Sequence, residues 1–559
     1  MDLQRLFLYI ALALLLFLVW DAWQRDYNPA RQAQPTAAQQ PETPAATGPT
    51  PPTDVPSGIP SPAVPAGATG TPSTSAAPAR QQATVSVHTD TLQVSISLDG
   101  GDIVEADLLK YPVSLEARDQ PFRLLQEGPQ GVYVAQSGLL GPDAPDHHAL
   151  YSSPSTSYEL APGEDQLTVA LHWDGPNGLK VTKLFTFQRG DYLIKVQFKI
   201  ENGSTAPWAG RMYAQLQRTQ SLGETQSRFG TYTYTGAAIS GPEKLYEKVN
   251  FDEMAKQNLS RDVAGGWVAM IQHYFVSAWV PPQTQTNHYY TNVLKDSGHY
   301  IIGTVTQPIE VAPGQSGELA AGLFAGPKLQ NRLEQIAKGL DLTVDYGWLW
   351  FIAQPIFWLL KAIHGLVGNW GWAIVLVTVV VKAAFYHLSA TSYRSMANMR
   401  RVQPRLTAIR ERYAGDKQRL NQAMMDLYKT EKINPLGGCL PIAVQIPVFI
   451  ALYWVLLESV ELRQAPFILW IVDLSTKDPY FVLPLLMGIT MFIQQKLNPA
   501  PPDPIQAKVM MTLPFIFTVF FAFFPAGLVL YWLVNNTLSI AQQWNITRNI
   551  ERSVKPASN

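Results

Sequence analysis

The sequence predicts a multidomain membrane protein, in which a large external all-β domain precedes an α-helical polytopic core. Three observations lead to this fold class. At 559 residues the chain exceeds the usual size of one domain. Its apolar residues are concentrated after residue 348, where they form long runs. Before that point hydrophobic residues alternate with polar ones, which is typical of half-buried strands.

The first 83 residues predict an anchor and a linker. Leu6–Trp20 is almost purely apolar, and bulky residues follow it instead of the small ones of a cleavage site. This favours an uncleaved signal-anchor transmembrane helix over residues 1–25, with its N-terminus in the cytoplasm. Residues 26–83 are rich in Pro, Ala, Ser and Thr, and they cannot bury enough surface to offset their ordering entropy. We expect a disordered linker there.

Residues 84–327 have the pattern of an antiparallel β-sandwich. Apolar residues alternate from Leu92 to Leu98 and end at Asp99-Gly100-Gly101, a turn sequence. Two further alternating runs, Val181–Phe187 and Tyr192–Ile200, flank the turn residues 188–191 and predict a hairpin. The scattered histidines and acidic residues of this region show no spacing typical of a metal site or a catalytic triad; they are His172, Asp174, His273 and Glu310. The only cysteine is Cys439, so no intramolecular disulfide can form.

Two segments connect this domain to the core. Lys328–Leu340 has helical periodicity and predicts a connecting helix within residues 328–347. Residues 348–366 are rich in aromatic side chains and are interrupted by Pro355, which favours an amphipathic helix lying in the membrane interface. A further membrane span is the alternative.

Trp372–Leu388 is an apolar run that contains a single charge, Lys382. Lys382 lies ten residues after Trp372, or roughly 15 Å along a helix, which predicts a position near the middle of the membrane. A cation there costs ~2.5–3.5 kcal/mol on insertion scales, so a functional role is the default hypothesis. The alternative is that Lys382 reaches the cytoplasmic interface and anchors the helix.

Residues 390–433 predict a cytoplasmic helical hairpin. Apolar residues recur at intervals of three and four from Met399 to Tyr413 and again from Leu420 to Tyr428. The basic residues before the turn place this side of the membrane in the cytoplasm by the positive-inside rule. The candidates for docking lipid headgroups, ribosomal RNA or a targeting partner are Arg400, Arg401, Arg405 and Arg410. A solvated basic face without a partner is the alternative.

Four more apolar runs predict the remaining spans: Leu440–Leu457, Phe481–Ile493, Val509–Phe524 and Leu528–Ile540. The count is an anchor plus five spans, with both termini in the cytoplasm. We find no acidic residue in the middle of a span, which argues against a proton-coupled pump. The polar residues within the spans either bond helix to helix or line a wet recess; they are Thr378, Gln445, Gln494, Gln495, Asn535 and Asn536.

Three long stretches resemble one known family. They are NPLGGCLPIAVQIPVFIALYWVL, SVELRQAPFILWIVDLSTKDPYFVLPLLMG and FPAGLVLYW, and they are similar to the YidC/Oxa/Alb family of membrane protein insertases in its Gram-negative form. The resemblance implies an inner-membrane insertase and chaperone that is no enzyme and needs no cofactor, metal or nucleotide. It implies nascent membrane proteins as clients, and the Sec translocon, the ribosome, targeting factors and membrane lipids as partners.

The same resemblance carries a hydrophilic groove onto this core, which residues 370–559 would form. The family's functional cation falls on Lys382, where arginine is more usual, so the charge is kept and the bidentate fork is lost. Gln495 and Trp532 fall at groove positions, and Thr378 and Asn535 are candidates beside them. The external domain is expected to be a β-supersandwich, whose shape carries no activity by itself. A transporter or channel, or a sugar-acting external domain, are the alternative functions.

Overall fold

The computed structural model describes Pro56 and residues 83–221, 233–413, 415–431, 440–498 and 504–554. The predicted signal anchor and all of the predicted linker except Pro56 and residue 83 lie outside these residues. The same holds for Asn434–Cys439, for most of the loop that follows Asn498 and for the chain after Val554.

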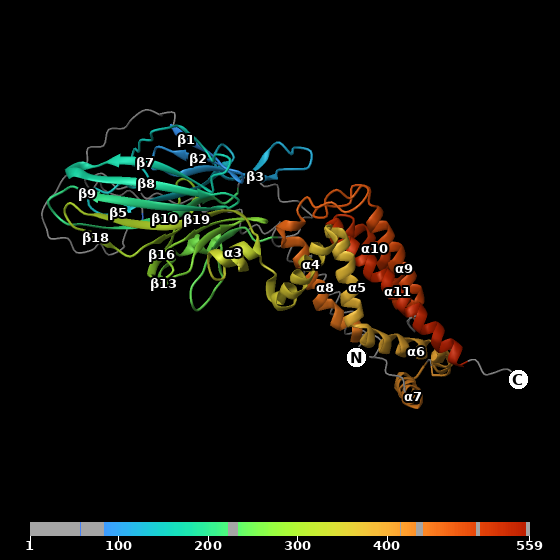
Figure 1. Cartoon of the computed structure of the whole chain (residues 1–559). Helices are drawn as coiled ribbons and strands as arrows, with labels where there is room; N and C mark the ends of the chain where they lie inside the picture. Colours follow the sequence, from blue (N-terminus) through green and yellow to red (C-terminus); the bar gives the residue numbers. More distant parts are fainter. Residues whose placement is uncertain are drawn as a thin grey trace. The chain divides into compact units, whose positions relative to one another are not determined.

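The described residues before Lys328 form two β-sheets (Figure 1). The larger sheet has the strand order β13-β16-β17-β10-β5-β4-β3-β2-β1-β6, with β18 also paired to β10. Its strands are β1 Thr84–His88, β2 Leu92–Ser97, β3 Ile103–Pro112, β4 Pro121–Gly128, β5 Gly131–Leu140, β6 Ser157–Glu159, β10 Trp208–Thr219, β13 Ser260–Ala264, β16 Thr286–Leu294, β17 His299–Val305 and β18 Ile309–Val311.

The second sheet has the order β12-β11-β14-β15-β19-β9-β8-β7. Its strands are β7 Gln166–Asp174, β8 Leu179–Gln188, β9 Leu193–Asn202, β11 Gly236–Ile239, β12 Glu247–Val249, β14 Val268–Ile271, β15 Phe275–Val280 and β19 Ser316–Pro327. A short helix, α2 at Phe251–Lys256, follows β12.

The predicted strands and their pairing are confirmed where the alternation was clearest. β8 and β9 pair antiparallel, with Val181 opposite Ile200 and Phe187 opposite Ile194. The apolar residues of both strands are buried in one core that the two sheets share. Lys183 occupies a core-facing position of β8 and is 0% exposed, so a charged group lies inside the sandwich.

The segment after β19 is not the single connecting helix that we predicted. α3 covers only Gln330–Ile336, and a 3-10 turn follows at Leu340–Thr343. Ala337 ends α3 because its backbone is extended, with φ −156 and ψ 144. Gly339 then adopts φ 80, a left-handed conformation that glycine takes without a steric cost.

The helical part contains α4 Trp350–Val367, α5 Trp370–Ala384, α6 Tyr386–Arg412, α7 Lys417–Thr430, α8 Leu440–Glu458, α9 Val482–Leu497, α10 Pro504–Phe521 and α11 Ala526–Val554. α11 packs against α5, α6 and α9, and α10 packs against α9 (Figure 1). α4 packs against α5 and α8. The faces that these helices turn toward one another form a second apolar core.

The apolar run that carries Lys382 is bent, contrary to our expectation of one straight span. α5 ends at Ala384, and α6 begins at Tyr386 at an angle of 68° to it. Phe385, at the break, has φ −93 and ψ 11, which departs from the geometry of a regular helix. Lys382 therefore lies in the last turn of α5, directly before this bend.

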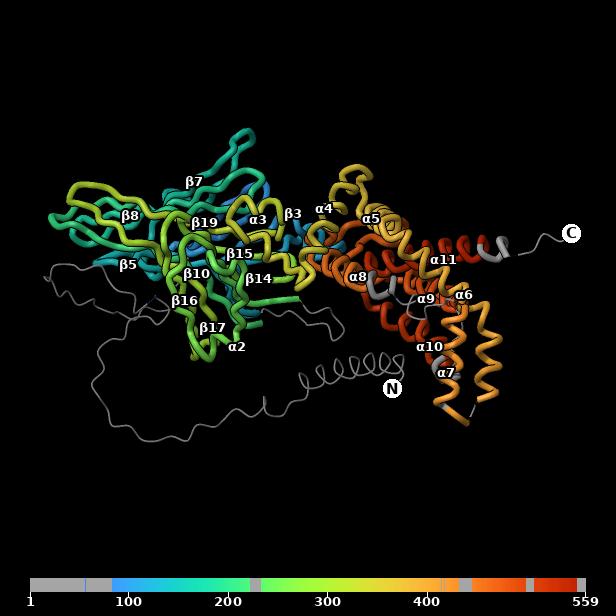
Figure 2. Tube along the Cα trace, turned by 90° about the horizontal axis from the view of Figure 1, so that it is seen from below, coloured from blue at the N-terminus to red at the C-terminus, as the bar shows by residue number. Residues whose placement is uncertain are grey.

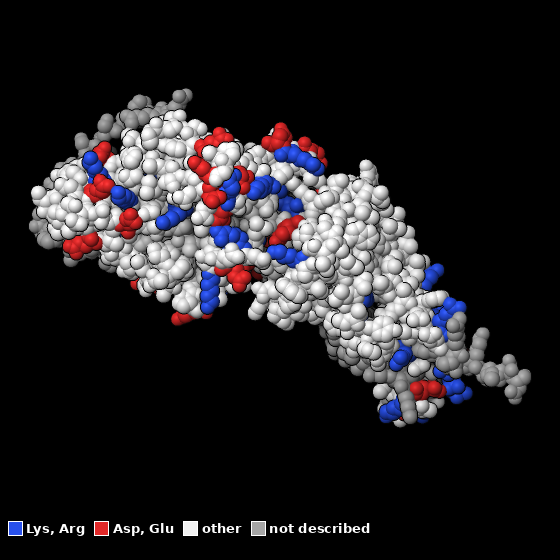
Figure 3. Space-filling view, viewed as in Figure 1, with Lys and Arg blue, Asp and Glu red and all other residues white. Residues whose placement is uncertain are grey.

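Judged by length and composition alone, few of the described helices qualify as membrane spans. Within the described residues, Gly347–Val367 is long and apolar enough to cross a membrane, and the bent pair α5–α6 would count as a second if it is one span. α4, expected to lie in the interface, is thus long enough for the alternative of a further span. Figure 3 shows few charged side chains over most of the helical surface in this view, with lysine and arginine gathered near α6 and α7.

α6 and α7 form the predicted hairpin and lie side by side (Figure 2). Val402 and Leu406 of α6 are buried against Met424, Leu427 and Tyr428 of α7. Asp416 caps α7 by accepting hydrogen bonds from the backbone N–H groups of Gln418 and Arg419. The apolar seam that we inferred from the intervals of three and four is therefore confirmed.

Buried polar contacts connect the end of β19 and the β14–β15 turn to the end of α8. Lys328 Nζ lies 3.2 Å from Glu458 Oε2, and both side chains are almost fully buried. His273 Nε2 donates to the carbonyl of Leu457 at 2.9 Å. These contacts satisfy charged and polar groups that burial would otherwise leave unpaired.

Candidate functional site

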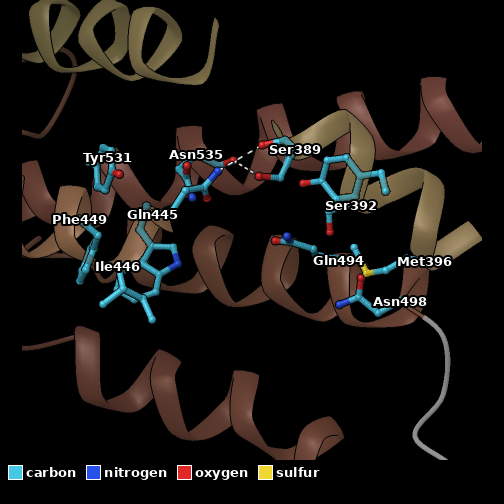
Figure 4. Close-up of a pocket in the computed structure, with 13 residues that line it drawn as sticks. Ser389, Ser392, Met396, Gln445, Ile446, Phe449, Gln494, Asn498, Tyr531 and Asn535 are labelled. Carbon is cyan, nitrogen blue, oxygen red and sulfur yellow. Dashed lines mark hydrogen bonds between the residues drawn. The ribbon is translucent and has the colours of Figure 1, made fainter. Parts of the chain in front are cut away.

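A cavity of about 240 Å³ lies among α6, α8, α9 and α11. Its lining residues converge from the four elements on one space, as Figure 4 shows. They are Ser389, Ser392, Tyr393, Met396, Gln445, Ile446, Phe449, Gln494, Asn498, Tyr531, Trp532, Asn535 and Ser539. The lining thus combines hydroxyl and amide groups with aromatic and aliphatic side chains.

The polar part of the lining comes mainly from serines and amides. Gln445 Nε2 of α8 donates to Ser389 Oγ of α6 at 3.4 Å (Figure 4). Asn498 Oδ1 accepts from Gln543 Nε2 at 3.2 Å, which joins the end of α9 to α11. Such groups exchange hydrogen bonds with water or with a polypeptide at little cost, since they carry no charge.

Aromatic side chains form the opposite part of the lining. The Phe449 ring lies 4.4 Å from the Trp532 ring in an edge-on arrangement and 5.9 Å from the Tyr531 ring. Phe521 of α10, which does not line the cavity, packs against Trp532 with the two ring centroids 4.6 Å apart. The cavity therefore has an amide-rich part and an aromatic part, and the aromatic part suits apolar side chains.

Lys382 lies next to this cavity without lining it. Its side chain is 8% exposed, and Nζ donates to Ser539 Oγ at 2.7 Å. Ser539 does line the cavity, and its hydroxyl donates to the carbonyl of Asn535 at 2.7 Å. The ammonium is therefore separated from the cavity by a single hydroxyl group. We expected it to project into a water-filled groove, whereas here it is buried beside the cavity.

The other predicted groove residues divide into two groups. Trp532 and Asn535 line the cavity, as does Gln494, whereas Gln495 and Thr378 are not among the lining residues. Thr378 is fully buried and bonds the Ile374 carbonyl of its own helix at 2.7 Å, which is a structural role.

Residue-by-residue reasoning missed the serines and one asparagine: Ser389, Ser392, Ser539 and Asn498. One signal was present, because Trp532, Asn535 and Ser539 recur at intervals of three and four and so share a face of α11. Ser389, Ser392 and Met396 recur at the same intervals on α6, but they precede the hairpin in a segment that was read mainly for its charge.

The four arginines proposed for docking lie on α6. Arg400, Arg401 and Arg405 are exposed, and Arg410 is half-buried. Arg405 forms an ion pair with Glu431 after α7. Within the described residues, no group of three or more histidine, cysteine, aspartate or glutamate side chains could hold a metal ion.

Two family models match the chain. Residues 84–359 match the YidC periplasmic domain, and residues 362–553 match the 60Kd inner membrane protein. The chain is 53% identical to "Membrane protein insertase YidC" of Thioalkalivibrio sulfidiphilus (strain HL-EbGR7), over 99% of this chain and 100% of that protein. It is also 53% identical to the protein of the same name from Nitrosococcus oceani, again over 99% and 100%.

A solved structure described as "Active YidC insertase crystal structure with the first transmembrane domain resolved" is 18% identical to this chain. The likeness covers 83% of this chain and 92% of that one, with a TM-score of 0.38. At this TM-score it adds nothing to what the family models and the full-length relatives establish.

Proposed function

This chain belongs to the YidC family of membrane protein insertases, which are inner-membrane proteins with a periplasmic domain, and we propose that the cavity among α6, α8, α9 and α11 is its client site. The polar part of a client segment enters the cavity while the apolar part passes into lipid. No covalent chemistry is needed for this, since the work is to lower the cost of moving polar groups into the membrane.

The single observation that carries the proposal is the hydrogen bond of Lys382 to Ser539, a lining residue of the cavity. A buried cation close to a polar cavity attracts the carboxylates of an entering segment. The intervening hydroxyl keeps the contact indirect, so the client is held weakly and is released as its apolar part reaches lipid. Lysine supports a role based on charge, because it lacks the bidentate geometry of arginine.

The mixed lining suits both the polar groups and the apolar side chains of a client segment. Serine and amide groups replace the hydrogen bonds that a client loses on leaving water. The aromatic region around Phe449 and Trp532 receives apolar side chains before they meet lipid. The helices carry large apolar side chains on their outer surface, among them Leu485, Phe515 and Val519, which supports a lipid-facing exterior.

The proposed partners are the ribosome, membrane lipids and the Sec translocon, and the basic surface of α6 supports the first two. The exposed arginines of α6 suit the phosphates of ribosomal RNA and lipid headgroups, and this basic end is placed in the cytoplasm. The proposed topology keeps a signal anchor within residues 1–25 and two cytoplasmic termini, as expected from the sequence. Large clients are handled together with the Sec translocon, and small ones by this protein alone.

Site-specific crosslinking tests the client site. A photoreactive side chain is placed at Ser392 or Ile446 within the cavity, and at Val519 on α10 as a matched control that is 67% exposed and outside it. With a ribosome-stalled client, the two cavity positions are expected to crosslink strongly and position 519 weakly. Crosslinking from position 519 alone would place the client on another surface and contradict the proposal.

A further inference from the structure

A second cavity, of about 160 Å³, lies in the β part of the chain, and its lining is unusually acidic. It is formed where the β2–β3 turn meets β4, β5 and the segment after β5. The lining residues are Ser97, Asp99, Asp102, Val104, Glu127, Val134, Gln136, His147 and His148. Three of these are carboxylates, and none of the described lining residues is a lysine or an arginine.

Asp102 forms the floor of this cavity and is 6% exposed. Ser137 N–H donates to its Oδ1 at 3.3 Å. The nearest cation, Lys183 Nζ, is 3.9 Å from the same oxygen, and it donates instead to the carbonyls of Gly100 at 3.0 Å and Ser137 at 2.8 Å. Lys183 therefore compensates the Asp102 charge at 3.9 Å, while its own hydrogen bonds go to the two carbonyls.

A chain of buried polar groups holds the side wall in place. Tyr290 donates to Gln215 Oε1 at 2.6 Å, and Gln215 Nε2 donates to Gln136 Oε1 at 2.9 Å. Gln136 alternates along β5 with core residues such as Ala135, so it points away from the sandwich core. Buried amides are costly unless they are hydrogen-bonded, and this chain of bonds satisfies them and fixes the orientation of the cavity wall.

A tyrosine positions the histidine side of the cavity. The hydroxyl of Tyr213 lies 2.5 Å from His147 Nδ1 and accepts from the His147 backbone N–H at 3.0 Å. The ring of Tyr213 has room to lie over β5 because residue 138 is glycine; a Cβ there would be 2.6 Å from the tyrosine hydroxyl. His147 is thereby held against the cavity, with the His148 ring 4.2 Å from its own.

The carboxylates of the cavity repel one another. Partial desolvation at the rim, followed by the charges of Asp99 and Glu105, raises the pKa of Glu127 above its usual value. Burial also raises the pKa of Asp102 to about 6, against the opposing effect of Lys183. Asp99 and Glu127 are exposed at the rim, so this charge is open to a ligand from solvent.

We infer that this cavity is a binding site for an organic cation, namely a guanidinium or alkylammonium group. The volume is below that of a drug-sized pocket, so it takes one such group and not a large molecule. The acceptors are spread around the walls, and within the described residues no three carboxylate or imidazole groups converge on a metal position. A guanidinium presents five N–H donors in a plane, which suits acceptors that are spread in this way. Two kinds of ligand carry such a cationic group: a small free amine and a polypeptide with a basic side chain.

Titration calorimetry on the full-length protein in detergent tests the inference. Agmatine, which carries a guanidinium and an amine, is the first probe, and the peptide Gly-Arg-Gly amide is the second. We expect saturable one-to-one binding of at least one of them, weakened by added salt. If the peptide binds more tightly, the natural ligand is a polypeptide side chain; if agmatine does, it is a free amine.

The exposed rim provides the decisive variant. Asp99→Asn combined with Glu127→Gln should weaken binding at least about tenfold, because charge-assisted hydrogen bonds are lost without a change of shape. Glu164→Gln combined with Asp165→Asn removes the same charge from an exposed turn outside the cavity and should leave binding unchanged. The inference would be overturned if the unmodified protein showed no saturable binding or if the rim variant bound the probes equally well. It would also be overturned if glucose, an uncharged probe, bound with the same sensitivity to the rim substitutions. It does not depend on the client site, so either can fail alone.

Discussion

The ammonium of Lys382 and the hydroxyl of Ser539 are joined by a hydrogen bond of 2.7 Å between the last turn of α5 and the middle of α11. Ser539 also faces the membrane cavity. One contact thus satisfies a buried cation, connects two helices and brings positive charge close to the proposed client site.

Removing this hydroxyl should destabilise the helical core. Ser539→Ala leaves the Lys382 ammonium without its partner, and a hydrogen bond to a charged group contributes about 1.5–3 kcal/mol. We expect a lower thermal unfolding temperature, measured by tryptophan fluorescence in detergent. Ser539→Thr keeps the hydroxyl and serves as the control. If alanine and threonine at this position gave equal stability, the contact would have no energetic role.

The crossing of α9 and α10 depends on a glycine. A Cβ at Gly488 would lie 1.9 Å from Thr518 Oγ1, which is held by its hydrogen bond to the Pro514 carbonyl at 2.7 Å. Gly488→Ala should therefore cost about 1–3 kcal/mol through overpacking, and Thr518→Ala in the double variant should recover part of this loss. Gly365→Ala, where a Cβ meets no atom within 4 Å, is the matched control. Additive effects of Gly488→Ala and Thr518→Ala would contradict the proposed clash.

A buried histidine should make the β part of the chain sensitive to acid. Burial, followed by the charge of Lys328, lowers the pKa of His273 to about 4. The unfolded chain then binds a proton below about pH 6.5 that the folded chain does not. The contribution of His273 to stability is therefore present above pH 6.5, and up to about 3 kcal/mol of it is lost as the pH falls toward 4.

Unfolding temperatures of the full chain between pH 4.5 and pH 7.5 measure this loss. His273→Gln should flatten part of the decline, whereas the exposed His88→Gln should not. Parallel pH profiles for the unmodified protein and His273→Gln would show that another group is responsible.

The basic face of α6 should bind ribosomes through charge. Arg400→Glu, Arg401→Glu and Arg405→Glu together should reduce co-sedimentation with ribosomes strongly at 50 mM salt and little at 500 mM, since the Debye length falls from above 10 Å to a few ångströms. Lys195→Glu with Lys199→Glu, two exposed positions of β9, controls for charge reversal elsewhere. Unchanged co-sedimentation at low salt would remove the docking role.

Local patterns were enough to predict much of the fold. The alternation in β8 and β9 gave both strands and their pairing, and the seam from Met399 to Tyr428 gave the hairpin. The break at Phe385 was not predictable in this way, because the residues on both sides of it are compatible with a helix and neither proline nor glycine marks it. α5 and α6 both pack against α11, but α5 also contacts α4 whereas α6 also contacts α7 and α8, and no local sequence pattern reports these tertiary contacts.

The sites show the same division. The charge of Lys382 and the face of α11 with Trp532 and Asn535 were visible in the sequence. The contact of Lys382 with Ser539 was not, because it joins residues 157 positions apart. Asp102 and Lys183 were likewise unremarkable as single residues, and only the packing of two sheets brings them within 3.9 Å.

Insertion by Lys382 variants tests the central claim most directly. The protein is reconstituted in liposomes, and protease protection measures the insertion of two clients that differ only in acidic residues within the translocated segment. At equal protein levels, Lys382→Ala should lower insertion of the acidic client on the order of tenfold, equivalent to ~1.4 kcal/mol, and affect the neutral client less, while Lys382→Arg should restore it. Equal insertion of the acidic client by Lys382→Ala and the unmodified protein would contradict the account.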